Sequence, residues 1–395
     1  MDATQATAAD RPGLSSDDLT FFFDPLHTGV ARLARAFAAA WRAGTGDAAT
    51  ETRAAVAALA AAGLTRWCVP EQHGGAPVGR PDGIDVRAVT LVREALGWAD
   101  GLLDTAFAMQ GLGSLPISLA GTPEQQAHYL PGIIDGSRLG AFALTEPDSG
   151  SDVASLQCSA ERDGADWRLT GTKTFISNAG VAGQYVVFAN ADPTAGRRGI
   201  TAFIVEPEDA GLTIEPFEVI APHPIGTLHF DHCHVPGTRL LGELGGGFKL
   251  AMATLDTFRT TVAGAAIGMA RRALDEALDR ARQHRQFGLP LIEHQQVAAA
   301  LADSATEYDA ARLLVYRAAH ARDVQVGRVS KEVAMAKLFA TEAAQRIIDR
   351  AVQIHGGLGV KRGTVVERLY REVRALRIYE GTSEIQRLII AAALR

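Results

Sequence analysis

The chain has 395 residues, of which 47% are hydrophobic and 21% are charged, and its formal net charge is −6. This length allows two or three domains with buried cores, and the composition excludes disordered and collagen-like chains. The acidic balance argues against nucleic acid as a partner, because the phosphate backbone binds basic surfaces.

The first segment, residues 1–18, is acidic and has neither a basic start nor an apolar stretch. We therefore expect a disordered tail rather than a signal peptide. The longest membrane candidate, Thr260 to Ala270, has about half the length that a bilayer requires, so no membrane span is predicted. The three cysteines are far apart and show no disulfide or metal spacing, which favours a reducing, cytoplasmic location.

Residues 19–137 are rich in alanine and repeat their apolar residues at helical spacing, which predicts an N-terminal helical domain. The pattern changes in residues 138–243, where short alternating runs such as LGAFALTEP and QYVVFANAD are separated by Gly, Pro, Asp and Asn. Because no helical run intervenes, we expect a central antiparallel, barrel-like β domain. Helical spacing returns in residues 244–395, where long helices with short connections are typical of a four-helix bundle. The predicted fold class is therefore α+β and multidomain.

Within the β region, HFDHCH is the densest group of potential metal ligands. Alternation along a strand puts His229, Asp231 and Cys233 on one face, and His232 and His234 on the other. The usual zinc spacing is also absent, so we expect no metal.

No G-x-G-x-x-G follows a predicted strand and opens a helix, so the sequence excludes a Rossmann turn for binding a nucleotide. HGGLGVKRG, from His355 to Gly363, follows a helix; it is either a helix end with a left-handed glycine or a backbone nest for a phosphate. TEPDSGSD and TFISNAG end predicted strands and offer hydroxyl groups, and they either turn the chain or bind a ligand.

Near the C-terminus, RIYEGTSEIQ places Glu380 and Gly381 in a tight joint between two helical stretches. Ser383 and Gln386 form a capping-box pattern that predicts the start of the last helix just past the glycine. Glu380 can complement the positive end of that helix, or it can serve as a catalytic carboxylate.

Together and in order, these motifs resemble those of the acyl-CoA dehydrogenase family. The resemblance is carried by VPEQHGG, GTPEQQAHYLP, ALTEPDSGSD, GTKTFISNAG, LDTFR, RQFGLPL, AVQIHGGLGV and IYEGTSEIQ. It implies the same three parts in the same order, with FAD bound between the β domain and the bundle. It also implies a homotetramer, an acyl-CoA substrate and an electron-transfer flavoprotein as electron acceptor.

The resemblance further implies roles for individual residues. Glu380 would abstract the α-proton of an acyl thioester, while a hydride passes from the β-carbon to flavin N5. The cofactor would be bound by Leu144, Thr145, Phe175, Ser177, Arg285, Phe287, Gln295, Gln353, Gly357, Thr382 and Glu384. The substrate would be bound by Ser151, Asp256, Arg259, Tyr379 and Gly381.

A carboxylate suits this chemistry, because an α-proton of a thioester is a poor acid. The reaction needs a positioned base, donors for the enolate oxygen and a hydride acceptor. Burial by the acyl chain would raise the pKa of Glu380, whereas the helix dipole would lower it.

The chain departs from the family pattern at three places. Phe175 stands where many members have tryptophan, and His284 stands where an arginine is expected, so we expect Arg285 to contact the FAD phosphate instead. The segment from Ile220 to Leu228 is shorter than the usual loop near the CoA entrance, so the thiol carrier is either CoA or a carrier protein. The alternatives to a dehydrogenase are an acyl-CoA oxidase, a flavin monooxygenase and a catalytically silent thioester-binding subunit.

Overall fold

The computed structural model describes residues 13–78, 83–325 and 327–395. The chain divides into two compact units, which are described separately. The helical unit comprises the chain up to Ala43, Asp85–Asp104 and Arg259–Arg395, and the sheet unit comprises Gly44–Ile84 and Thr105–Phe258. The order of helices, then strands, then helices confirms the predicted α+β fold class.

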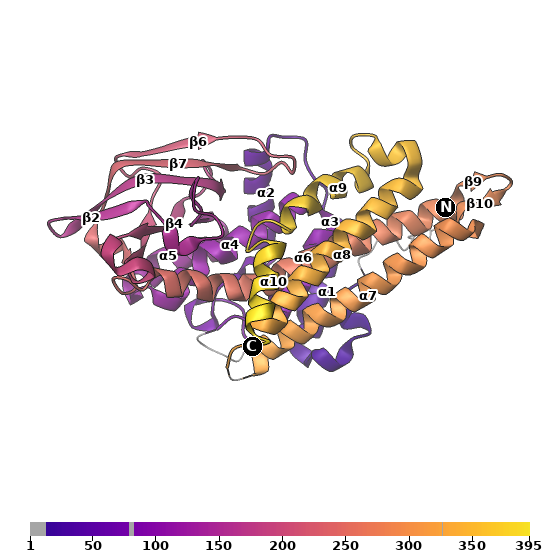
Figure 1. Ribbon diagram of the computed structural model, residues 1–395, viewed down its shortest axis with the longest axis horizontal. Coiled ribbons are helices and arrows are strands. Elements are labelled where there is room, and N and C mark those ends of the chain that lie inside the picture. Colours follow the sequence, from indigo (N-terminus) through magenta and orange to yellow (C-terminus); the bar gives the residue numbers. More distant parts are fainter. Residues whose placement is uncertain (1–12, 79–82, 326) are drawn as a thin grey trace. The chain divides into compact units, whose positions relative to one another are not determined.

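Figure 1 labels most of the helices and strands of the described residues. The helices are α1 (Pro25–Ala40), α2 (Ala48–Ala61), α3 (Val86–Ala99), α4 (Gly101–Ala120), α5 (Pro123–Asp135), α6 (Gly247–Gln283), α7 (Gln295–Val324), α8 (Ser330–His355), α9 (Val365–Leu376) and α10 (Ser383–Ala392). The strands are β1 (Gly140–Ala143), β2 (Ser159–Asp163), β3 (Asp166–Ser177), β4 (Gln184–Asn190), β5 (Ile200–Val205), β6 (Leu212–Pro216), β7 (Ile225–Val235), β8 (Leu240–Leu241), β9 (Arg285–Gln286) and β10 (Leu289–Pro290).

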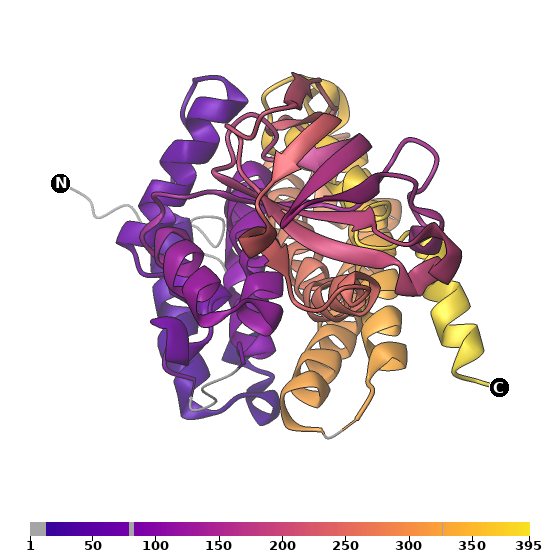
Figure 2. The same cartoon turned by 90° about the vertical axis from the view of Figure 1, so that its left-hand side faces the viewer.

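The sheet unit is built on one sheet, whose strands are drawn in magenta to salmon in Figure 2. Its strand order is β6-β7-β3-β2-β4-β5-β8, and β1 pairs with β4. Most neighbours are antiparallel, as predicted, but β1 and β2 pair parallel with β4. Branched and aromatic side chains from the strands fill the core, among them Trp167, Tyr185 and Phe203. This packing fixes the ends of β1 and β3, which carry several of the predicted site residues.

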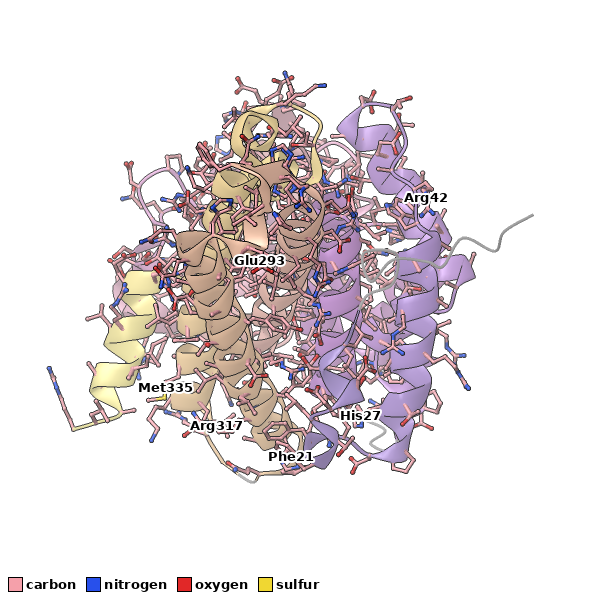
Figure 3. All side chains as sticks on the ribbon, turned by 90° about the vertical axis from the view of Figure 1, so that its right-hand side faces the viewer. Phe21, His27, Arg42, Glu293, Arg317 and Met335 are labelled. Atoms are coloured by element: carbon pink, nitrogen blue, oxygen red, sulfur yellow. The ribbon has the colours of Figure 1, made fainter. Side chains whose placement is uncertain are left out.

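The helical unit packs long helices closely. α7 and α8 lie side by side (Figure 1), and at the end of this pair the Arg317 guanidinium lies 3.7 Å from the Met335 sulfur (Figure 3). Small residues bring α6 against α3, because a Cβ added to Gly268 would lie 2.0 Å from the Glu94 carbonyl oxygen. Across the described part of the chain, no helix has both the length and the apolar character needed to cross a membrane.

The N-terminal segment differs from the prediction of a tail where it is described. Residues 1–12 lie outside the described part, but Ser15–Asp17 forms a 3-10 helix, and Leu14 and Ser15 are buried. The Ser15 backbone N–H and hydroxyl both donate to Glu94 Oε1, at 3.0 and 2.8 Å. Tyr316 donates its hydroxyl to Glu94 Oε2 at 2.5 Å. These bonds hold the segment on the helical unit.

The predicted alternation of HFDHCH along β7 is wrong. The pairing of β7 with β3 shifts between Phe230 and Cys233, so β7 carries one extra residue there, and His232 has a φ of +48°. This β-bulge changes which face the following side chains occupy. Cys233 is therefore buried, whereas His229 lies half-buried beside Glu215 at 3.1 Å. The described residues hold no group of three or more His, Cys, Asp or Glu side chains arranged to bind a metal.

Candidate active site

Glu380 lies in a short joint between α9 and α10 of the helical unit. Its φ is +53° and that of Gly381 is +87°, so the chain makes a left-handed turn in which a non-glycine residue is uncommon. A Cβ on Gly381 would also lie 2.6 Å from the Gln386 amide nitrogen, so glycine is needed there. α10 begins just past this glycine, as predicted, but its N-cap is Thr382, whose hydroxyl accepts the Ile385 N–H at 3.3 Å.

The predicted capping box of Ser383 and Gln386 is therefore displaced. Ser383 donates its hydroxyl to Glu342 Oε1 at 2.6 Å, because it is already the first residue of α10. Gln386 donates its amide to the Gly381 carbonyl oxygen at 3.0 Å. Both side chains thus tie the joint to its surroundings.

Two buried cations hold the backbone of the joint. Arg259 Nε of α6 donates to the Glu380 carbonyl oxygen at 3.1 Å, and Lys337 Nζ of α8 donates to the Gly381 carbonyl oxygen at 2.8 Å. Burial lowers the pKa of Lys337 to about 8, although the charge of Glu380 acts in the opposite direction. Because both hydrogen bonds go to carbonyl oxygens, they fix the turn without using the Glu380 carboxylate.

The Glu380 carboxylate is buried and has little hydrogen bonding. Its side chain is 7% exposed, and its nearest ion-pair partner is Arg93 Nη1 of α3, 3.9 Å from Oε1. Oε2 has no hydrogen-bond partner among the described residues. Arg93 donates instead to both oxygens of Asp104, at 2.9 and 2.7 Å. Burial raises the pKa of Glu380 more than Arg93, Lys337 and Arg259 lower it, so the carboxylate is prepared to accept a proton.

The other predicted site residues of the helical unit lie in three places. Tyr379 and Thr382 lie in the joint with Glu380, and Glu384 follows in the first turn of α10. The β9–β10 hairpin exposes Phe287, with a φ of +50°, and Arg285, which donates to the Gly288 carbonyl oxygen at 2.9 Å. The exposed residues that complete the set are Gln295 at the start of α7, Gln353 in the last turn of α8 and Gly357 just after it.

α8 ends at His355, and Gly356 follows it with a φ of +60°. The helix thus ends on a glycine, as predicted, but the ψ of −135° puts Gly356 outside the predicted left-handed helical conformation. The phosphate nest stays a prediction.

In the sheet unit, the ends of β1 and β3 bring four predicted residues together. The Thr174 N–H donates to the Thr145 carbonyl oxygen at 2.9 Å, and Lys173 Nζ donates to the Leu144 carbonyl oxygen at 3.1 Å. Phe175 follows with a φ of +55° and 62% of its surface exposed. Two residues later, Ser177 Oγ lies 3.1 Å from His223 Nε2. An exposed aromatic ring and a hydroxyl group therefore stand beside the loop that begins at Leu144.

The remaining two predicted residues of the sheet unit lie apart from this strand end in sequence. Ser151 is exposed in the loop that follows β1. Asp256 is half-buried in the part of α6 that belongs to the sheet unit.

Within each unit taken separately, some predicted cofactor residues have features suited to binding an aromatic ring of a dinucleotide. Five described non-glycine residues have a positive φ, and Phe175, Phe287 and Glu380 are three of them. Such conformations cost free energy and are concentrated at functional sites. Two of the three are exposed phenylalanines, which offer flat faces to the aromatic rings of a dinucleotide.

Sequence reasoning missed the side chains that support these residues. Arg93 and Asp104 lie on α3 and α4, Lys337 lies on α8, and His223 lies in the loop before β7. Arg93, Asp104 and Lys337 are at most 1% exposed. The available signal was a charged residue within an otherwise apolar helical run, as in VTLVREALGW.

Comparison with known proteins gives matches along nearly the whole chain. The N-terminal, middle and C-terminal domains of acyl-CoA dehydrogenases match residues 25–137, 141–233 and 245–395. An acyl-CoA dehydrogenase of Bacillus subtilis is 43% identical over 338 residues, which are 84% of this chain and 87% of that protein.

Solved structures agree with the sequence matches. Butyryl-CoA dehydrogenase from Megasphaera elsdenii superposes with a TM-score of 0.86 at 34% identity, over 94% of this chain and 98% of that one. The prolyl acyl carrier protein oxidase AnaB gives a TM-score of 0.86 at 28% identity, over 94% of this chain and 99% of that one.

Proposed function

Because the chain belongs to the acyl-CoA dehydrogenase family, whose members are FAD-dependent oxidoreductases, we propose that it oxidises an acyl-CoA to the trans-2-enoyl thioester with Glu380 as base. The observation that carries this proposal is the buried Glu380 carboxylate with one oxygen lacking a hydrogen-bond partner among the described residues. A structural carboxylate at this depth is normally paired. A carboxylate oxygen without a hydrogen-bond partner is suited to receiving a proton.

The joint supports the proton transfer in two ways. Oε2 of Glu380 takes the α-proton, and burial makes it a stronger base than an exposed carboxylate. The backbone N–H of Glu380 is held in one orientation by the Arg259 and Lys337 hydrogen bonds to the neighbouring carbonyl oxygens. We assign this N–H to the thioester oxygen, where negative charge grows as the proton leaves.

Bound FAD supplies the hydride acceptor, its N5 atom. In the sheet unit, Phe175, Thr145, the Leu144 backbone and Ser177 would hold the flavin ring, with Ser177 near N5. In the helical unit, Thr382 and Glu384 would hold FAD beside the base, and Phe287, Gln295 and Arg285 would hold its adenosine and phosphate portion. Gln353 and Gly357 would hold the FAD of a neighbouring subunit in a tetramer. For the substrate we propose Ser151, Asp256, Arg259, Tyr379 and Gly381.

The proposed electron acceptor is an electron-transfer flavoprotein. A second candidate function is oxidation of a thioester on a carrier protein, because the structurally similar AnaB is an oxidase of a carrier-bound prolyl group. Rapid reoxidation of the substrate-reduced flavin by O2 would favour the oxidase.

The direct test is anaerobic titration of the purified holoenzyme with a panel of acyl-CoA thioesters. Bleaching of oxidised flavin by one thioester, with an enoyl thioester as product, is the expected result. If no acyl-CoA bleaches the flavin but a carrier-bound acyl group does, the second candidate is correct.

The Arg285 assignment is tested separately by Arg285→Ala. Loss of the phosphate contact should increase FAD dissociation by about tenfold or more, since a hydrogen bond to a charged group contributes about 1.5–3 kcal/mol. Unchanged FAD retention would remove Arg285 from the cofactor site. Arg282→Ala, an exposed arginine at the end of α6, is the matched control.

A further inference from the structure

His223 lies in the loop before β7 and is held at both ring nitrogens. Its Nδ1 lies 2.9 Å from the Ala221 carbonyl oxygen, and its Nε2 lies 3.1 Å from Ser177 Oγ. The ring is half-buried, and this burial lowers the pKa of His223. Nothing in the dehydrogenation chemistry described above uses this side chain.

The two contacts determine where the ring proton lies. A carbonyl oxygen can only accept a hydrogen bond, so Nδ1 must carry the proton that it donates to Ala221. In the neutral ring Nε2 is then an acceptor. Ser177 must donate its single hydroxyl proton to Nε2, which leaves only oxygen lone pairs on Ser177 for a ligand.

Because His223 accepts the hydrogen bond of the Ser177 hydroxyl, the redox state of a flavin determines whether its N5 can bind Ser177. N5 of oxidised flavin has a lone pair and accepts hydrogen bonds, whereas N5 of reduced flavin carries a hydrogen and donates one. A hydroxyl with only lone pairs to offer can bind the reduced form at N5 but not the oxidised form. A serine whose proton is free can rotate to serve either form.

We propose that His223 is a positioning residue that fixes Ser177 as a hydrogen-bond acceptor toward flavin N5 and thereby favours the reduced cofactor. This inference rests on the proposed place of Ser177 beside N5. It assigns to a side chain in the loop before β7 a part in setting the driving force of hydride transfer.

The test measures the equilibrium of FAD reduction against a reference dye, without any thioester substrate. His223→Phe keeps the ring volume but removes the acceptor, and His223→Ala is the second variant. A net hydrogen bond of about 1.4 kcal/mol predicts a roughly tenfold loss in the reduction equilibrium, which is about 30 mV for a two-electron couple. Because no thioester takes part, a wrong substrate proposal would not affect the result.

A double-mutant cycle identifies the route of the effect. In a Ser177→Ala background, His223→Phe should cause no further change, since the hydroxyl that it orients is gone. The matched control is His229→Phe on β7, which exchanges a half-buried imidazole without touching Ser177. An unchanged potential in both His223 variants overturns the proposal, and so does an equal shift in the Ser177→Ala background.

If both His223 variants lose FAD, the proposal is tested on the unmodified holoenzyme by finding which ring nitrogen of His223 carries the proton. ¹⁵N NMR of histidine-labelled protein, with His223 assigned by the signals that move in Ser177→Ala, should show a proton on Nδ1 and none on Nε2. A neutral ring protonated on Nε2 would overturn the proposal.

Discussion

Two buried glutamates, one in each unit, differ in the number of hydrogen bonds that their carboxylates accept. Glu146 of the sheet unit accepts hydrogen bonds from Lys173 Nζ at 2.7 Å, from the Cys158 N–H at 2.9 Å and from the Gln157 N–H at 2.7 Å. Glu380 of the helical unit has one ion-pair neighbour at 3.9 Å and one oxygen without a described hydrogen-bond partner. Both side chains are buried, so burial alone does not separate the structural carboxylate of Glu146 from the proposed base, Glu380.

The difference lies in where the neighbouring donors point. Around Glu146, side-chain and backbone donors point to the carboxylate itself, and these hydrogen bonds hold the loop next to Leu144. Around Glu380, Arg259 and Lys337 point to backbone carbonyl oxygens, and Arg93 points to Asp104. A carboxylate that works as a base is oriented through its backbone and keeps its oxygen atoms available.

The largest expected effect comes from removing the base. Glu380→Gln should lower the rate of thioester-dependent flavin bleaching by about 10²–10⁴-fold, the usual contribution of a general base. FAD binding should be retained, because the amide preserves the shape of the side chain. Anaerobic stopped-flow absorbance measures the bound oxidised flavin and its rate of bleaching. Bleaching at the wild-type rate would mean that Glu380 is not the base and only interacts with the start of the last helix.

Removing Lys173, the cation that pairs with Glu146, tests whether Glu146 has a structural role. Lys173→Met leaves the buried Glu146 carboxylate without its cation and should destabilise the protein by about 3–5 kcal/mol. Adding Glu146→Gln should restore part of this loss, since the stranded charge is removed. Urea unfolding measures the difference, and a loss below about 1 kcal/mol would contradict a structural role for the pair.

The pH dependence of bleaching sharpens the comparison further. Glu380 must be ionised to accept a proton, so the rate should be present above its raised pKa and lost as pH falls through it. Lys337→Gln should move this midpoint to higher pH, because the Lys337 charge lowers the pKa of Glu380. Lys331→Gln, an exposed lysine on the same helix, should leave the midpoint unchanged. A downward move in Lys337→Gln would contradict the charge arrangement.

The smallest effect is expected for a third glutamate that is exposed. Glu215 pairs with His229 at 3.1 Å, with 73% of its side chain in solvent. Glu215→Gln should change the free energy of unfolding by about 0.5 kcal/mol or less, because water screens such pairs. A loss comparable to that of Lys173→Met would mean that pairing, rather than burial, governs these three carboxylates.

Much of this arrangement was predictable from short-range patterns. Helical period, strand alternation and turn residues predicted the order of helices, strands and helices, because these signals extend over only a few residues. The place of Glu380 between two helices was predictable for the same reason. The capping residue was misplaced by one position, which is a common uncertainty at helix ends.

Features set by distant parts of the chain were not predictable. Arg93 reaches the joint from α3, and its partner Asp104 lies on α4, so no local spacing indicates their contact. The bulge in β7 depends on its pairing with β3 and shifted the face of Cys233. His223 acquires its orientation only from the loop that places it against the end of β3.

The contact of Ser15 with Glu94 has a practical consequence for the choice of cloning boundaries. A gene trimmed to begin at α1 would omit Ser15, whose two donors face Glu94 Oε1. The trimmed product would retain Tyr316 on the other oxygen and would lack Leu14 and Ser15, which are both buried in the helical unit. Expression trials, affinity tags and protease sites should therefore be placed upstream of Gly13.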